Sequence, residues 1–173
     1  MIFFYSFQLD GLFVNVLSNI IGGLLVIFIA FYINEIRFKV DISGIWIVRT
    51  IHIDTNLKRY KDMELEYQIY LIQNGLEIKG SGEKISQKMS FQSSYYEYPR
   101  SERVLSKIYG SLEKNFVTKS KINLMIIEKG KLRETRTTFS LRIKRNDLLT
   151  GEFYSTAADS HGKVEMRKLF PFK

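Results

Sequence analysis

The chain has 173 residues, 45% of them hydrophobic and 14% aromatic, and a formal net charge of +8. Apolar residues occur along its whole length, which excludes intrinsic disorder. The absence of cysteine excludes disulfide scaffolds, thiolate metal sites and cysteine nucleophiles. No Lys or Arg precedes Arg37, so residues 35–173 carry all 26 bases against 17 acids. A segment of that length suits one modest domain with its own core.

An uncharged segment of 24 residues, from Gly11 to Asn34, lies near the N-terminus. As an α-helix it would extend roughly 36 Å, enough to cross a hydrocarbon core of about 30 Å. A cleaved signal peptide is disfavoured, because no basic residue precedes the segment and no small-residue cleavage site follows it. We predict a membrane anchor over residues 1–36 with its span at 11–34 and residues 1–9 at the interface. A basic link over residues 37–43 follows it.

Basic residues flank only the C-terminal side of this span, at Arg37 and Lys39 and then at Arg49. The positive-inside rule therefore predicts a cytoplasmic C-terminal domain.

One face of the predicted span carries Asn15, Asn19 and Gly22, at steps of four and three residues. Small residues let helices approach closely, and asparagine side chains can hydrogen-bond between helices. This pattern favours a homo-oligomer held by the span. The alternative is that Gly and Asn are merely tolerated, as they are in many single spans.

From Ser43 onward, apolar residues alternate with polar ones instead of running continuously. The segment from Met63 to Leu71 is an example, and the hairpin dipeptide Asn74-Gly75 follows it. A further turn is expected at residues 159–162. The pattern predicts eight strands, at residues 44–53, 63–73, 76–85, 103–113, 121–128, 133–144, 147–156 and 163–169.

Short strands in succession with tight turns indicate an all-β domain over residues 44–173. We expect a small, lipocalin-like, eight-stranded antiparallel up-and-down β-barrel preceded by an N-terminal transmembrane helix. The aromatic-rich segment 86–102 interrupts this succession of short strands and tight turns. Such a long connection is either functional or a flexible loop.

Enzymatic chemistry finds little support in the residues. His52 and His161 are the only histidines, so no HxxxH metal pair exists. The consecutive residues Asp159-Ser160-His161 cannot form a catalytic triad in one turn. We expect a protein that is not an enzyme, with no metal, no cofactor, and no DNA or RNA partner.

The alternation places a mixed set of side chains inside the barrel. Aromatic rings, hydroxyls and a few cations suit a flat anionic ligand such as a nucleotide. The alternatives are that these residues belong to the core or rim, and that the basic surface meets an anionic membrane leaflet. The predicted ligand-binding residues are Trp46, Thr50, Tyr67, Lys84, Arg133, Thr135, Ser155 and Lys168.

The layout also resembles a known family. The span, the basic link, Gly44-Ile45-Trp46, the run from Gln73 to Gly82, and the run from Leu149 to Phe153 resemble the CD-NTase-associated membrane β-barrel effectors of CBASS anti-phage defence. These are also described as SMODS-associating, membrane-anchored, β-strand-rich effectors. Members usually have two spans, whereas the residues here support one.

The resemblance implies a receptor in the bacterial inner membrane. Its barrel would bind a cyclic dinucleotide from a partner nucleotidyltransferase and drive oligomerisation, membrane disruption and death of the infected cell. Two alternatives remain open. One is a membrane-tethered, lipocalin-like carrier of a lipid or other apolar molecule, which would need an apolar cavity. The other is a structural membrane protein that depends on no small molecule.

Overall fold

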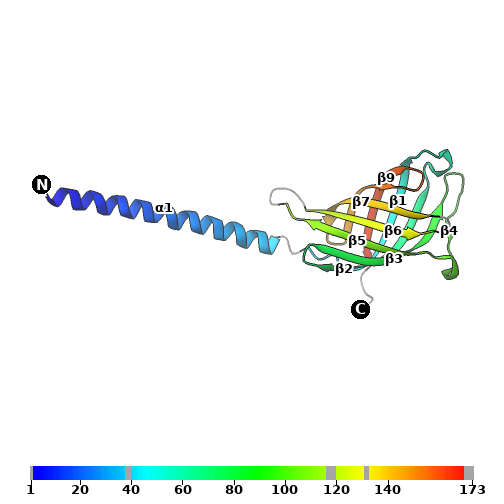
Figure 1. Cartoon of the computed structure of the whole chain (residues 1–173), viewed down its shortest axis with the longest axis horizontal. Helices are drawn as coiled ribbons and strands as arrows, with labels where there is room; N and C mark the ends of the chain where they lie inside the picture. The colour runs from blue at the N-terminus through cyan, green and yellow to red at the C-terminus, as the bar shows by residue number, and fades with distance from the viewer. Residues whose placement is uncertain (1, 38–39, 116–119, 131–132, 170–173) are drawn as a thin grey trace. The chain divides into compact units, whose positions relative to one another are not determined.

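The computed structural model describes residues 2–37, 40–115, 120–130 and 133–169 (Figure 1). Contacts divide the described chain into two compact units. The first is a helix and the second, from Val40 onward, is a β-barrel.

The helix α1 runs from Ile2 to Arg37 without interruption. Its segment Phe13–Ile33 has a mean hydropathy of 2.4 and is long and apolar enough to cross a membrane. The side chains of this segment are exposed, so they contribute nothing to a core within the chain. An apolar surface of this kind is stable when lipid covers it.

The barrel consists of eight long antiparallel strands, and each pairs with its neighbours in the chain (Figure 1). Pairing between the first and last of them closes the sheet. The strands are β1 (Gly44–Asp54), β2 (Glu64–Asn74), β3 (Glu77–Lys88), β5 (Leu105–Glu113), β6 (Lys121–Lys129), β7 (Glu134–Arg145), β8 (Leu148–Ser155) and β9 (Ser160–Leu169). The predicted eight-stranded up-and-down barrel is confirmed.

Two connections differ from the prediction. The last turn ends at Asp159 and β9 begins at Ser160, whereas the turn was expected at residues 159–162. Ala158 and Asp159 adopt positive φ angles of 58° and 46°, so the chain reverses earlier than expected. Segment 86–102 contains the end of β3 and a two-residue strand, β4 (Tyr96–Glu97), which pairs with β3.

The barrel interior changes from apolar to polar along several strands. On β1 the inward side chains are Trp46, Val48, Thr50 and His52, in that order. The cross-strand register continues this gradient around the barrel, so that Thr137 and Ser155 face each other on neighbouring strands. One end of the interior is therefore apolar and the other is polar.

A β-bulge adjusts which side chains face the polar end. Glu66 pairs with Ser86 and Tyr67 with Lys84, which leaves Ile85 as an extra residue on β3. The bulge reverses the alternation, so Lys84 and Gln87 both line the interior. Ser86 instead points outward, where its hydroxyl donates to Glu66.

Candidate functional site

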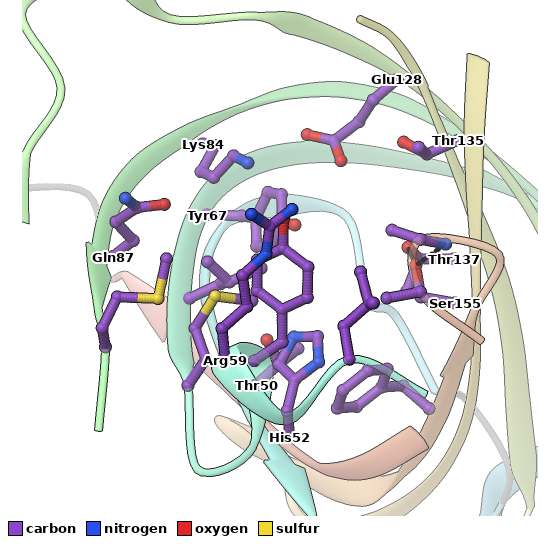
Figure 2. A pocket seen from close by; sticks show the side chains of 18 of the residues that line it. Thr50, His52, Arg59, Tyr67, Lys84, Gln87, Glu128, Thr135, Thr137 and Ser155 are labelled. Atoms are coloured by element: carbon purple, nitrogen blue, oxygen red, sulfur yellow. Dashed lines mark hydrogen bonds between the residues drawn. The ribbon is translucent and has the colours of Figure 1, made fainter. Parts of the chain in front are cut away.

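A cavity of about 430 Å³ occupies the polar end of the barrel (Figure 2). Strands β1, β2, β3, β6, β7 and β8 contribute to its wall, together with residues of the connections that follow β1, β3, β6 and β8. Apolar side chains line part of it: Leu57, Met63, Leu65, Met89 and Phe153. Its polar lining consists of Thr50, His52, Arg59, Tyr67, Lys84, Gln87, Glu128, Arg133, Thr135, Thr137 and Ser155.

These polar residues are arranged by depth. Thr50, His52, Thr137 and Ser155 are buried, and we call them the cavity floor. Arg59 and Arg133 are exposed, and we call them the cavity mouth. The cavity therefore has a neutral polar floor, apolar side chains in parts of its wall, and two arginines at its opening.

The floor is only partly satisfied by hydrogen bonds within the protein. The hydroxyls of Thr137 and Ser155 lie 2.9 Å apart and hydrogen-bond to each other. Thr50 Oγ1 and both ring nitrogens of His52 have no hydrogen-bond partner among the residues that the structure describes. The His52 ring stands edge-on to Phe153, with 4.9 Å between ring centroids. Figure 2 shows the imidazole directed into the cavity.

Burial sets the protonation state of His52 at the floor and of Tyr67, which is also buried. Desolvation, with the positive charge of Lys84 as a second cause, lowers the pKa of His52 to about 4. Desolvation also raises the pKa of the Tyr67 phenol, so that this hydroxyl stays protonated. At neutral pH the imidazole is therefore uncharged, with one nitrogen that donates a hydrogen bond and one that accepts.

Between floor and mouth, Lys84 and Glu128 extend into the cavity from β3 and β6 (Figure 2). Burial raises the pKa of the Glu128 carboxyl, while the Lys84 ammonium and neighbouring hydroxyls act in the opposite direction. Arg59, Lys84 and Arg133 outnumber the single lining carboxylate of Glu128. This excess of positive charge favours an anionic group at the outer part of the cavity.

Part of the long segment 86–102 contacts the cavity wall. Tyr98 donates its phenol hydrogen bond to Gln87, and Lys84 Nζ lies 5.6 Å from the centroid of the Tyr98 ring. Arg103, the residue directly after the segment, forms a salt bridge of 2.7 Å with Glu83 on β3. The segment therefore belongs to the surroundings of the cavity.

Comparison of the sequence with known protein families and curated proteins, and of the fold with solved structures, gives no match.

The structure brings together six of the eight side chains predicted to bind a ligand. The residues that line the cavity are Thr50, Tyr67, Lys84, Arg133, Thr135 and Ser155. Trp46 and Lys168 do not line it, because they belong to the apolar end. Trp46 is 0% exposed and donates its indole N–H to the Ile42 carbonyl at 2.7 Å. Lys168 Nζ lies 5.6 Å from the Trp46 ring centroid and donates to the Asp41 carbonyl at 3.4 Å.

Sequence reasoning did not select three prominent cavity residues. His52 shares the inward alternation of β1 and could have been selected by it. Glu128 ends a predicted strand, where the alternation no longer distinguishes inside from outside. Arg59 lies in the connection between β1 and β2, for which periodicity gives no signal.

The neighbouring residues Ser160 and His161 lie apart from the cavity and from each other's surroundings. Ser160 is buried and donates to the Ala157 carbonyl at 2.9 Å, whereas His161 is exposed with its Nε2 3.7 Å from Asp54.

The residues predicted to join the spans lie in α1. Asn15, Asn19 and Gly22 share one face of a continuous helix. A side chain added at Gly22 would meet no atom of this chain within 4 Å.

Proposed function

We propose that the chain is a membrane-anchored receptor and effector of bacterial anti-phage signalling whose barrel binds a cyclic dinucleotide. The observation that carries this proposal is the division of the cavity into a neutral polar floor and a cationic mouth. A cyclic dinucleotide matches that division, because it combines flat neutral bases with phosphodiester anions. The volume of about 430 Å³ lies within the usual range for small-molecule sites.

The polarity of the floor argues against the alternative of a lipid carrier. An acyl chain offers no hydrogen bond to Thr50 or His52, and burying such groups without partners costs about 1–3 kcal/mol each. A carrier of apolar molecules would therefore bind against a penalty at the deepest part of its own cavity.

The helix α1 supplies the second half of the proposal. Its apolar segment Phe13–Ile33 anchors the chain in the bacterial inner membrane, and the bases that follow it favour a cytoplasmic barrel. A nucleotide made in the cytoplasm by a partner nucleotidyltransferase would then reach the cavity. Ligand binding would promote homo-oligomerisation and disruption of the membrane.

The ligand is tested with the full chain in nanodiscs, by calorimetry against cyclic di- and trinucleotides. We expect one cyclic dinucleotide to bind and Arg133→Glu to weaken it at least about tenfold, because a charge-assisted hydrogen bond is worth about 1.5–3 kcal/mol. Arg142→Glu is the matched control, since it makes the same charge change on the outer face of β7. Binding by none of these nucleotides, or equal losses in both variants, would contradict the proposal.

The output is tested by crosslinking in membranes, with and without the nucleotide, alongside a growth assay. Interhelical hydrogen bonds in membranes average about 0.6 kcal/mol, so the Asn15, Asn19 and Gly22 face gives a weak, switchable association. Gly22→Leu should leave ligand binding intact and lower both crosslinking and toxicity. Gly23→Leu is the control, because Gly23 lies about 100° around the helix from Gly22. Unchanged crosslinking and killing by Gly22→Leu would show that other surfaces build the oligomer.

A further inference from the structure

Two neighbouring residues at the cavity floor carry buried polar atoms without hydrogen-bond partners in the described structure. Thr50 is 2% exposed and His52 4% exposed, and they occupy successive inward positions on β1. Within the described residues, neither the Thr50 hydroxyl nor the two His52 nitrogens has a hydrogen-bond partner. Glu128 Oε1, in the wall of the same cavity, is a fourth buried atom without a partner. Buried polar groups are nearly always paired, so four such atoms in one cavity indicate a site that is completed from outside the chain.

The chemistry of these atoms limits what can complete them. A neutral imidazole offers one donor and one acceptor, and a threonine hydroxyl offers either. A phosphodiester anion accepts hydrogen bonds but has no proton to donate, so it would leave the accepting nitrogen of a neutral imidazole without a partner. The matching group is neutral and carries a donor beside an acceptor.

The surroundings of the floor also favour a flat group. Phe153 stands against one side of His52, and the apolar side chains of Met63 and Leu65 belong to the same cavity. Apolar walls around a few hydrogen-bonding groups suit a planar heterocycle, whose faces are apolar and whose edge is polar. The cations that would hold an anion, Arg59 and Arg133, are the exposed residues at the mouth.

We propose that Thr50 and His52 bind the hydrogen-bonding edge of a neutral planar heterocycle such as a nucleobase, which enters the barrel base first while its phosphate stays at Arg59 and Arg133. This inference rests on the proposed function in taking the same cavity as the ligand site. It goes further in assigning recognition of the base to the floor and recognition of the phosphate to the mouth.

The chain offers a direct test, because it contains only two histidines. The full chain is labelled with ¹⁵N-histidine and placed in nanodiscs, and the His52 and His161 resonances are followed by NMR. His161, exposed on the outer face near Asp54, is the internal control. The probes are adenosine, guanosine, cytidine and uridine, the cyclic dinucleotides, and inorganic phosphate.

We expect at least one nucleoside to shift the His52 nitrogens and leave His161 unchanged, and phosphate alone to shift neither. His52→Leu should lower the affinity for that nucleoside about tenfold, because the hydrogen bonds of the imidazole are lost. Arg133→Leu should change the affinity for the nucleoside by less than about twofold relative to the wild type. It should weaken the binding only of ligands that carry a phosphate. Thr50→Val, which keeps the shape of the side chain, is the second floor variant if His52→Leu does not fold.

The outcomes separate this inference from the proposed function. If a cyclic dinucleotide binds without moving the His52 resonances, the assignment of the floor is wrong and the receptor proposal stands. If a nucleoside moves them while no cyclic dinucleotide binds, the receptor proposal fails and the floor assignment stands. The inference is overturned if inorganic phosphate alone shifts the His52 resonances. It is also overturned if no probe shifts them.

Discussion

The two ends of the barrel interior are built from the same strands, yet they bury different chemistry. On β1 alone, Trp46 and Val48 fill the apolar end. Thr50 and His52, two and four residues after Val48, lie at the cavity end. The indole N–H of Trp46 has a partner in the Ile42 carbonyl, whereas Thr50 and His52 have none in the described structure. The apolar end therefore stabilises the fold, and the cavity end leaves polar groups available to a ligand at the expense of stability.

Hydrogen bonds to the segment that precedes β1 support this division. Gln73 accepts a hydrogen bond from the Ile42 amide at 3.0 Å and donates to the Val40 carbonyl at 2.9 Å. These bonds fix the segment that enters β1 across the apolar end. Leu71 and Met166 are fully buried beneath it. Close packing of this kind resists any change of volume.

The largest expected effect follows from this packing. Trp46→Ala should lower the free energy of unfolding by about 3–5 kcal/mol, because it removes a buried aromatic side chain and leaves a cavity. Thermal unfolding of the full chain in detergent measures this, and we expect the midpoint to fall by roughly 10 °C or more.

His52→Leu is the matched change at the other end. It replaces a buried polar ring by an apolar side chain and should leave the midpoint unchanged or raise it. A loss as large as that of Trp46→Ala would show that the floor is as tightly integrated as the apolar end, and the comparison would fail.

The sequence predicts the barrel well, because its strands alternate regularly and turn dipeptides such as Asn74-Gly75 separate them. It predicts the cavity less well. Alternation says which residues face inward but not how far along the barrel axis they lie. Trp46 and Thr50 have the same parity and belong to opposite ends, and Lys168 was grouped with Lys84 for the same reason.

Two further features of the site lie beyond periodicity. The bulge at Ile85, which brings Lys84 and Gln87 onto the same side, depends on pairing with β2. Arg59 reaches the mouth from a connection, and only the closed barrel brings that connection over the cavity. Both features require the three-dimensional register.

A second prediction concerns acid. The folded-state pKa of His52 is about 4 and its ordinary value is 6.5, so the unfolded chain binds the proton first as pH falls. Stability should therefore decrease from about pH 6.5 and level off below about pH 4, with a total loss of about 2–3 kcal/mol from this group. Thermal unfolding between pH 7 and 4 measures it. The charged side chains that line the same cavity are Lys84, Arg59, Arg133 and Glu128, and the charge of Lys84 acts on the His52 pKa.

The titration of Glu128 changes stability in the direction opposite to that of His52. Its pKa is raised in the folded state, so its protonation favours folding as pH falls. His52→Leu should remove the imidazole's share of the acid-dependent loss, and Glu128→Gln should deepen the loss. The part that remains in His52→Leu comes from carboxyls with lowered pKa values, such as Glu64. Equal pH profiles for the wild type and His52→Leu would show that the floor imidazole does not set the acid sensitivity of the barrel.

The smallest expected effect compares two lysines. Lys84 Nζ and Lys168 Nζ each lie 5.6 Å from an aromatic centroid, the first over Tyr98 at the cavity end and the second over Trp46 at the apolar end. Such contacts at exposed sites are worth about 0.5–1 kcal/mol. Lys84→Met and Lys168→Met, which keep the aliphatic stem, should thus lower the free energy of unfolding by about that amount or less.

Ligand affinity should distinguish these two variants. Lys84 lines the cavity and should contribute to holding an anion, so we expect Lys84→Met to weaken binding of the proposed cyclic dinucleotide several-fold. Lys168→Met should leave the affinity unchanged, because its partners are Trp46 and the Asp41 carbonyl at the apolar end. Calorimetry of both variants in nanodiscs decides the matter. If Lys168→Met weakens binding as much as Lys84→Met, ligand recognition extends through the whole interior, and the two ends of the barrel do not divide stability from binding.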